Sequence, residues 1–331
     1  MRSYKPVVRL SEDFSEVGSP PKRSLYIAHA SFEPRATAVA TRSLMSLGVV
    51  YAFVVATRSS LDKISAYRES EARITESLKR QAATVSAIRF NRDQLLEYLR
   101  HLHAETEAAL SEFNFDAVIL DATTFPKDRL WVTIDYIKLR LPETRLLVLY
   151  VEPDAYNTEI LPSGWLSMGV KRVAAMPRFN GYQHASRPAL LVVIVGHEKE
   201  RMQITARNIE PQKLVLIGQG PQQHGSTAPT LPSILASYIG ADFAHIIDNG
   251  ASYFVGSRDY LGIRAAIHDI FLRFGEEFNI VISANGTKLQ SIGALIACRE
   301  NRRLTAVYTE PQIYNNDSYS KGWGSTWLLE I

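Results

Sequence analysis

The chain has 331 residues, of which 46% are hydrophobic, and its 37 basic and 34 acidic residues leave a formal net charge of +3. This length and apolar content exclude a disordered chain and favour two globular domains, while the near balance of charge neither requires nucleic acid nor excludes a phosphorylated ligand. The single cysteine, Cys298, excludes a disulfide framework and a cysteine-based zinc site.

The N-terminal stretch carries no apolar signal core, and no run reaches the roughly 18 uninterrupted apolar residues of a membrane-spanning helix. The sequence therefore predicts a cytoplasmic protein that makes no membrane contact.

After an extension over residues 1–23, short runs rich in Val, Ile and Leu alternate with segments of helical periodicity. The predicted strands are Leu25–Ala28, Tyr51–Ala56, Val85–Arg89, Ala117–Leu120, Arg145–Val151, Leu191–Val195, Lys213–Ile217, Ala244–Asp248, Asn279–Ser283 and Leu304–Thr309. The predicted helices are Arg35–Leu47, Ser60–Gln81, Arg92–Phe113, Lys127–Leu141, Met202–Asn208, Pro229–Ile239, Arg258–Phe274 and Lys288–Asn301. This alternation predicts an α/β fold with mostly parallel, doubly wound sheets.

Three sequence blocks occur twice, in the same order. The matching pairs are "SLYIAHASFEPRATAVATRSL" with "LLVVIVGHEKERMQITARNI", "FDAVILDATTF" with "FNIVISANGTK", and "YVEPDAYNTEILPSGW" with "YTEPQIYNNDSYSKGW". Such self-similarity predicts a tandem duplication that produces two Rossmann-like domains. We expect the domains to cover residues 1–180 and 181–331, with a linker near "MPRFNGYQHASRP", where Pro, Gly and polar residues cluster.

Ligands of open parallel sheets bind at the carboxyl ends of the strands, so the residues that follow each predicted strand are the candidates. The candidate ligand-binding residues are Arg35, Thr123, Thr124, Tyr156 and Asn157 in the first half, and Arg201, Asn285, Gly286, Thr287, Lys288, Tyr314 and Asn315 in the second. The candidate acids and bases are Glu33, Asp121, His197 and Glu198.

The turn Asn285–Lys288 is the most informative of these segments. A Gly permits close backbone approach, and the N-terminus of the following helix presents N–H groups to an anion such as phosphate. A helix cap that needs no ligand explains the same composition equally well. In the repeated Glu-Pro segments, Tyr156 and Tyr314 are suited to stacking on a base, or to packing within their loops.

Glu33 beside Arg35, and Glu198 beside Arg201, favour an architectural ion pair over general acid–base catalysis or a magnesium site. The sequence has no P-loop motif, and no G-x-G-x-x-G opens the first helix. We therefore expect neither a nucleoside triphosphatase nor a dinucleotide dehydrogenase. We also expect no cofactor and no metal.

The segments "NIVISANGTKLQSIGALIACRENRRLTAVYTE" and "DAVILDATTFPKDRLWVTIDYIKL" carry a family resemblance. A strand ending in a small polar turn, a helix, and a strand ending in an aromatic residue and Glu resemble the CRISPR-associated Rossmann fold (CARF) family. A tandem pair of such domains is similar to the SAVED sensors. The turn at Asn285–Lys288 lacks the second Gly of the family pattern, and Phe125-Pro126 replaces the turn in the first half.

This resemblance implies binding of a cyclic oligonucleotide in antiviral signalling, at times by a homodimer and at times with cleavage of the ligand. Because no effector domain is recognised in the chain, it implies a separate effector protein as partner. Two alternatives remain open: a nucleotide-degrading enzyme, either a phosphodiesterase or a nucleosidase, and a non-catalytic scaffold subunit of a defence complex.

Overall fold

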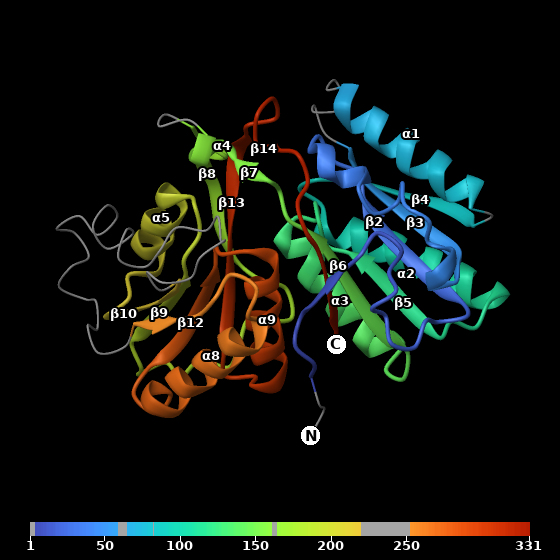
Figure 1. The fold of residues 1–331 in the computed structure, drawn as a ribbon. Helices are drawn as coiled ribbons and strands as arrows, with labels where there is room; N and C mark the ends of the chain where they lie inside the picture. Colours follow the sequence, from blue (N-terminus) through green and yellow to red (C-terminus); the bar gives the residue numbers. More distant parts are fainter. Residues whose placement is uncertain (1–3, 59–64, 82, 161–163, 220–251) are drawn as a thin grey trace. The chain divides into compact units, whose positions relative to one another are not determined.

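The computed structural model describes residues 4–58, 65–81, 83–160, 164–219 and 252–331. The chain forms two compact units (Figure 1): unit 1 comprises Met1–Ala155 together with Ser320–Ile331, and unit 2 comprises Tyr156–Tyr319. Each unit contains one main β-sheet and its own helices.

The sheet of unit 1 has the strand order β1-β15-β6-β5-β2-β3-β4. Its strands are β1 (Val8–Leu10), β2 (Ser24–His29), β3 (Val49–Arg58), β4 (Thr84–Asn91), β5 (Ala117–Asp121), β6 (Arg145–Val151) and β15 (Thr326–Glu330). Strands β2 to β6 are mutually parallel, whereas β15 is antiparallel to both β6 and β1. If the five parallel strands β2 to β6 are numbered 1 to 5 along the chain, their order across the sheet is 3-2-1-4-5. This is the order of a doubly wound sheet.

The helices of unit 1 connect these parallel strands. They are α1 (Ser65–Arg80), α2 (Leu95–Glu112) and α3 (Lys127–Arg140). Right-handed crossovers place α1 on one face of the sheet and α2 and α3 on the other, because the chain reverses direction across the sheet after β4. Both faces of the central strands are therefore covered, which explains why every residue of β2 and β5 is buried.

The sheet of unit 2 has the order β11-β10-β9-β12-β13-β8, which is again 3-2-1-4-5 for its five parallel strands. Its strands are β8 (Ser167–Ala175), β9 (Ala189–Ile194), β10 (Lys213–Gly218), β11 (Tyr253–Phe254), β12 (Asn279–Ala284) and β13 (Thr305–Tyr314). Its helices are α4 (Asn157–Ile160), α5 (Lys199–Ile209), α8 (Tyr260–Phe274) and α9 (Lys288–Glu300). Helices α8 and α9 pack side by side (Figure 1).

Each sheet contains one antiparallel strand, and that strand follows the Glu-Pro block of the other repeat. Strand β8 follows β6 along the chain but pairs with β13 in unit 2, and β15 follows β13 but pairs with β6 in unit 1. The chain consequently passes between the units twice, after Ala155 and after Tyr319. A two-stranded sheet of β7 (Ala155–Tyr156) and β14 (Ser320–Lys321) lies at these crossings.

The predicted fold class is confirmed, since the chain forms two α/β units with parallel-rich, Rossmann-like sheets. The expected boundary between residues 180 and 181 would place β8 in the first domain and β15 in the second. In the structure β8 belongs to unit 2 and β15 to unit 1. Pairing decides the difference, because β8 has its ladder partner in β13 and β15 has its main partner in β6.

The helix predicted over Arg35–Leu47 does not form. Two short 3-10 helices, Pro34–Thr37 and Met45–Leu47, replace it. Residues 35–40 are all buried, whereas an amphipathic helix buries only one face, and β-branched residues within the segment disfavour helix. The strand predicted at Ala244–Asp248, the helix predicted at Pro229–Ile239 and the start of the helix predicted at Ser60–Gln81 lie outside the described residues.

Candidate functional site

A buried ion pair occupies the carboxyl edge of the sheet in unit 1. Arg35 donates from Nε to Glu33 Oε2 at 2.8 Å and from its NH1 group to the Val151 carbonyl at 2.8 Å. Ser320 Oγ donates to the same Glu33 oxygen at 2.9 Å. The pair therefore joins the turn after β2 to the end of β6 and to the returning chain segment, as the expected architectural pair would.

Asp121, at the end of β5, is buried beneath this edge. Its carboxylate accepts a hydrogen bond from the Tyr26 hydroxyl at 3.0 Å and another from the Thr123 amide at 3.0 Å. Burial raises the pKa of the Asp121 carboxyl above its usual range, although these hydrogen bonds and Arg35 act in the opposite direction.

Replacement of Asp121 by Asn is expected to change how stability depends on pH. Because burial raises the folded-state pKa, the contribution of Asp121 to stability is present below the unfolded-state pKa and is lost as pH rises through the folded value. The stability of Asp121→Asn relative to the parent chain should thus increase as pH is raised from about 4, the pKa of an unperturbed Asp. Denaturant unfolding at a series of pH values measures this, and two parallel stability curves would contradict it.

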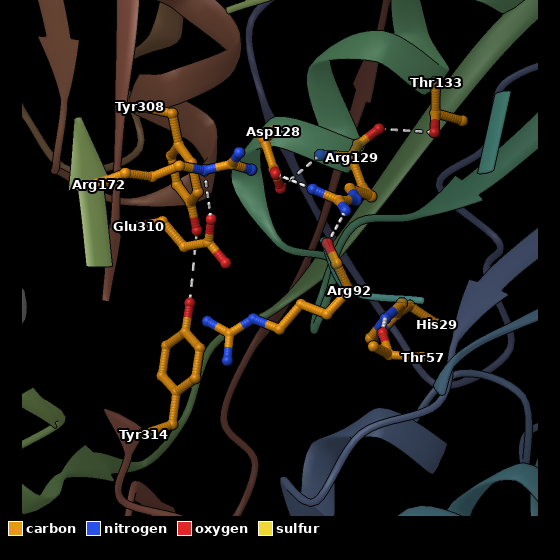
Figure 2. Close-up of polar contacts among 10 residues, drawn as sticks. All are labelled: His29, Thr57, Arg92, Asp128, Arg129, Thr133, Arg172, Tyr308, Glu310 and Tyr314. Carbon is orange, nitrogen blue, oxygen red and sulfur yellow. Dashed lines mark hydrogen bonds and ion pairs between the residues drawn. The ribbon is translucent and has the colours of Figure 1, made fainter. Parts of the chain in front are cut away.

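The hydroxyls of Thr123 and Thr124 are engaged within unit 1. Thr124 donates to the His29 carbonyl at 2.7 Å, and the Val151 amide donates to Thr123 Oγ1 at 3.1 Å. These contacts tie the turn after β5 to the ends of β2 and β6. The His29 ring, buried against Phe125, lies 3.3 Å from Thr57 Oγ1 (Figure 2).

The first turn of α3 holds a second buried ion pair in unit 1, between Asp128 and Arg129 (Figure 2). The Arg129 guanidinium also donates to the Arg92 carbonyl and lies 5.4 Å from the centroid of the Phe90 ring. Sequence reasoning missed this pair, because adjacent opposite charges at the start of a helix are ordinary on a solvated surface.

Unit 2 contains a counterpart of the Arg35 pair. Arg201 donates to Glu198 Oε2 at 2.5 Å and to the Thr309 carbonyl at 2.5 Å, and Ser167 Oγ donates to the other oxygen of Glu198. Each arginine also lies over the tyrosine that opens its Glu-Pro block, at 5.9 Å for Arg35 over Tyr150 and 5.7 Å for Arg201 over Tyr308. The repeated blocks thus build the same local arrangement in both units.

The turn Asn285–Lys288 is held closely by its own unit. Thr287 is the N-cap of α9 and forms a capping box with Gln290. Asn285 Nδ2 donates to Ser283 Oγ at 2.9 Å. A Cβ at Gly286 would lie 2.2 Å from Gln290 Oε1 and 2.8 Å from Ile194 Cγ2, so a larger residue there would displace the side chain that completes the capping box. Lys288 is the cation of this turn, and its side chain is half-buried.

Aromatic side chains form a continuous arc in unit 2. The rings of His197 and Tyr156 lie 4.8 Å apart, those of Tyr156 and Tyr319 6.1 Å, and those of Tyr319 and Tyr314 6.1 Å. The hydroxyls of Tyr314 and Tyr308 face one another at 3.4 Å (Figure 2). We call these five residues the aromatic arc; all are partly exposed. His197 follows β9, Tyr308 and Tyr314 lie on β13, Tyr319 follows β13, and Tyr156 lies on β7.

The arc contains one tyrosine from each copy of the Glu-Pro block, Tyr156 and Tyr314. Both belong to unit 2, because the chain crosses between units directly before Tyr156. The neighbouring amides brace the loops: Asn157 Oδ1 accepts from the Trp165 amide at 2.8 Å, and Asn315 Nδ2 donates to the Trp165 carbonyl at 2.9 Å. Their amide groups are therefore engaged within the fold.

The sequence-predicted residues fall into two sets. Glu33, Arg35, Asp121, Thr123 and Thr124 lie in unit 1, and all the others lie in unit 2. Tyr308 and Tyr319 of the aromatic arc were not among the predicted residues. A signal existed for Tyr308, because an aromatic residue precedes Glu-Pro in both copies of the block.

Among the described residues, no helix is long and apolar enough to cross a lipid bilayer. Within the same residues, no three His, Cys, Asp or Glu side chains converge as ligands for a metal ion.

The described fold and site define a protein of two Rossmann-like units with an aromatic cluster at the strand ends of one of them. No family model matches the chain, and no curated protein matches it in sequence. A solved structure of a type III CRISPR defence DNA nuclease activated by cyclic oligoadenylate is similar, with a TM-score of 0.51 and 11% sequence identity. The match covers 92% of this chain and 68% of that one, and at this identity it supports the fold.

Proposed function

We propose that the chain is a sensing module for a nucleotide second messenger of the cyclic oligonucleotide class, in an antiviral or stress signalling system. It passes the signal to a separate effector protein. The observation that carries this proposal is the aromatic arc at the carboxyl end of the sheet in unit 2, because partly exposed rings at this edge are suited to stacking on bases.

Two further points support the proposal. The similar solved structure belongs to a protein that cyclic oligoadenylate activates. The equal strand order of the two sheets and the paired arginine arrangements agree with a duplicated, CARF-like and SAVED-like origin. In this account Lys288 supplies positive charge at the end of β12, beside the strands that carry the arc.

Replacement of Tyr314 by Ala is expected to weaken binding of a cyclic oligoadenylate by about 1–3 kcal/mol, the usual loss of one base–aromatic stack. Isothermal titration with a panel of cyclic and linear oligonucleotides, cyclic oligoadenylates first, measures the affinity. Lys288→Ala should weaken binding as well, because it removes a charge that attracts phosphate.

Tyr182→Ala is the matched control, since Tyr182 lies in the same unit with 78% of its surface exposed and outside the arc. Equal losses for both tyrosine variants would reject the arc as the site, and no binding of any panel member would reject the function. Chromatography of the nucleotide after incubation distinguishes the two functions: intact nucleotide supports sensing, and cleaved nucleotide supports a degrading enzyme.

A further inference from the structure

Glu310 presents a buried negative charge in the middle of β13. Its side chain is 4% exposed, and it lies opposite Arg172 of β8, where the register of the two strands shifts. A buried carboxylate is costly unless it is paired. Arg172 Nε meets this requirement by donating to Glu310 Oε2 at 2.8 Å.

Arg172 differs from the two arginines that brace the units. Arg35 and Arg201 are buried, and each donates both to a carboxylate and to a backbone carbonyl. The Arg172 side chain is 48% exposed, and among the described residues Glu310 is its only polar partner. Glu310 therefore holds the guanidinium by Nε, and the two terminal NH2 groups, which carry four of its five donors, extend beyond the carboxylate (Figure 2).

The aromatic arc begins on the same strand. Tyr308 precedes Glu310 by two residues and so shares its face of β13, and the Tyr308 hydroxyl lies 3.4 Å from that of Tyr314. Arg172 is the cross-strand partner of Glu310, so its guanidinium lies on the same face of the sheet as Tyr308. Its fork offers several directed donors to the oxygens of one phosphodiester. Aromatic rings that suit a base and a guanidinium that suits its phosphate thus both lie along the stretch of β13 from Tyr308 to Tyr314.

We propose that Arg172 binds a phosphate group of the ligand in unit 2 and that Glu310 is its positioning residue. This inference rests on the proposed function and adds the residue that recognises the backbone of the nucleotide. It identifies the recognised chemistry as a phosphodiester flanked by a stacked base.

The test measures affinity for the cyclic oligoadenylate series as a function of salt. Arg172→Gln is expected to lower the affinity about 10- to 100-fold, the usual effect of losing a charge-assisted hydrogen bond. It should also reduce the slope of log affinity against log salt concentration by about 1, since one phosphate contact is lost. Arg172→Lys retains the charge but not the fork, so it should keep the slope and recover only part of the affinity.

The Glu310→Gln variant tests whether Glu310 positions the Arg172 guanidinium for the ligand or only stabilises the fold. It keeps the charge of Arg172 but weakens the contact that fixes it, so affinity should fall while the salt slope stays at the parental value. Arg207→Gln is the charge-matched control, because Arg207 is an exposed arginine of the same unit on α5. Thermal melts of each variant exclude unfolding as the cause.

Two results would overturn the inference. If Arg172→Gln and Arg207→Gln bind equally well while Tyr314→Ala binds weakly, Arg172 does not contact phosphate and the proposed function stands. If the parental chain binds no member of the series, the proposed function fails and this inference fails with it.

Discussion

Leu329→Ala is expected to lower the free energy of unfolding by about 2–5 kcal/mol, the usual cost of truncating a buried leucine. Leu329 is 1% exposed and lies on β15, which is inserted between β6 and β1 in the sheet of unit 1. The side chain therefore fills the core of a unit whose other strands all precede residue 152 in the chain. Denaturant unfolding followed by circular dichroism measures the change.

Leu272→Ala is the matched control for this truncation. Leu272, on α8, is 82% exposed, so the same chemical change should alter stability by no more than about 0.5 kcal/mol. If the two variants lose equally little stability, β15 is not a core strand of unit 1. That result would contradict the pairing of β15 with β6.

Arg35→Met is expected to destabilise the chain by about 3–5 kcal/mol, because it leaves the buried carboxylate of Glu33 without its partner. The double variant Arg35→Met, Glu33→Gln removes both charges and should recover a large part of that loss. A double-mutant cycle built from unfolding free energies gives the coupling between the two residues.

The control for this ion pair is an exposed one in the same unit. Arg140 and Glu107 contact each other at 2.6 Å with 42% and 41% of their side chains exposed, so Arg140→Met should cost about 1 kcal/mol or less. A loss at Arg35 no larger than the loss at Arg140 would show that the Glu33–Arg35 pair does not brace the turn after β2.

Much of the fold could be predicted because it depends on local pattern. Buried parallel strands are continuous apolar runs, and helices α2, α3, α8 and α9 begin and end within a few residues of the predicted bounds. The Glu33–Arg35 and Glu198–Arg201 pairs were likewise predictable from spacing, because each arginine follows its glutamate by two or three residues.

The exchange of strands could not be predicted from local pattern. Strands β8 and β15 each follow a copy of the Glu-Pro block. Nothing within either strand specifies whether it pairs with β6 or with β13. Tyr156 was therefore expected in the first domain and Tyr314 in the second, whereas the structure places both in unit 2. Arg172 was missed for the same reason, because its contact with Glu310 exists only after β8 joins β13.

The polar turn after β12 shows a second limit of sequence reasoning. The composition of Asn285–Lys288 suits a phosphate loop and a helix cap alike, and the structure uses Thr287 as the cap of α9. Only the contacts of each side chain separate the two roles, because both need a Gly, a hydroxyl and a helix N-terminus.

Hydrogen-exchange mass spectrometry with cyclic oligoadenylates shows both whether a nucleotide binds to the chain and which segments it contacts. If the aromatic arc binds the nucleotide, amide exchange should slow in the unit 2 peptides around Tyr156, His197 and Tyr308–Tyr319 when the nucleotide is added. Unchanged exchange with every member of the series, or protection confined to peptides outside these segments, would contradict this prediction.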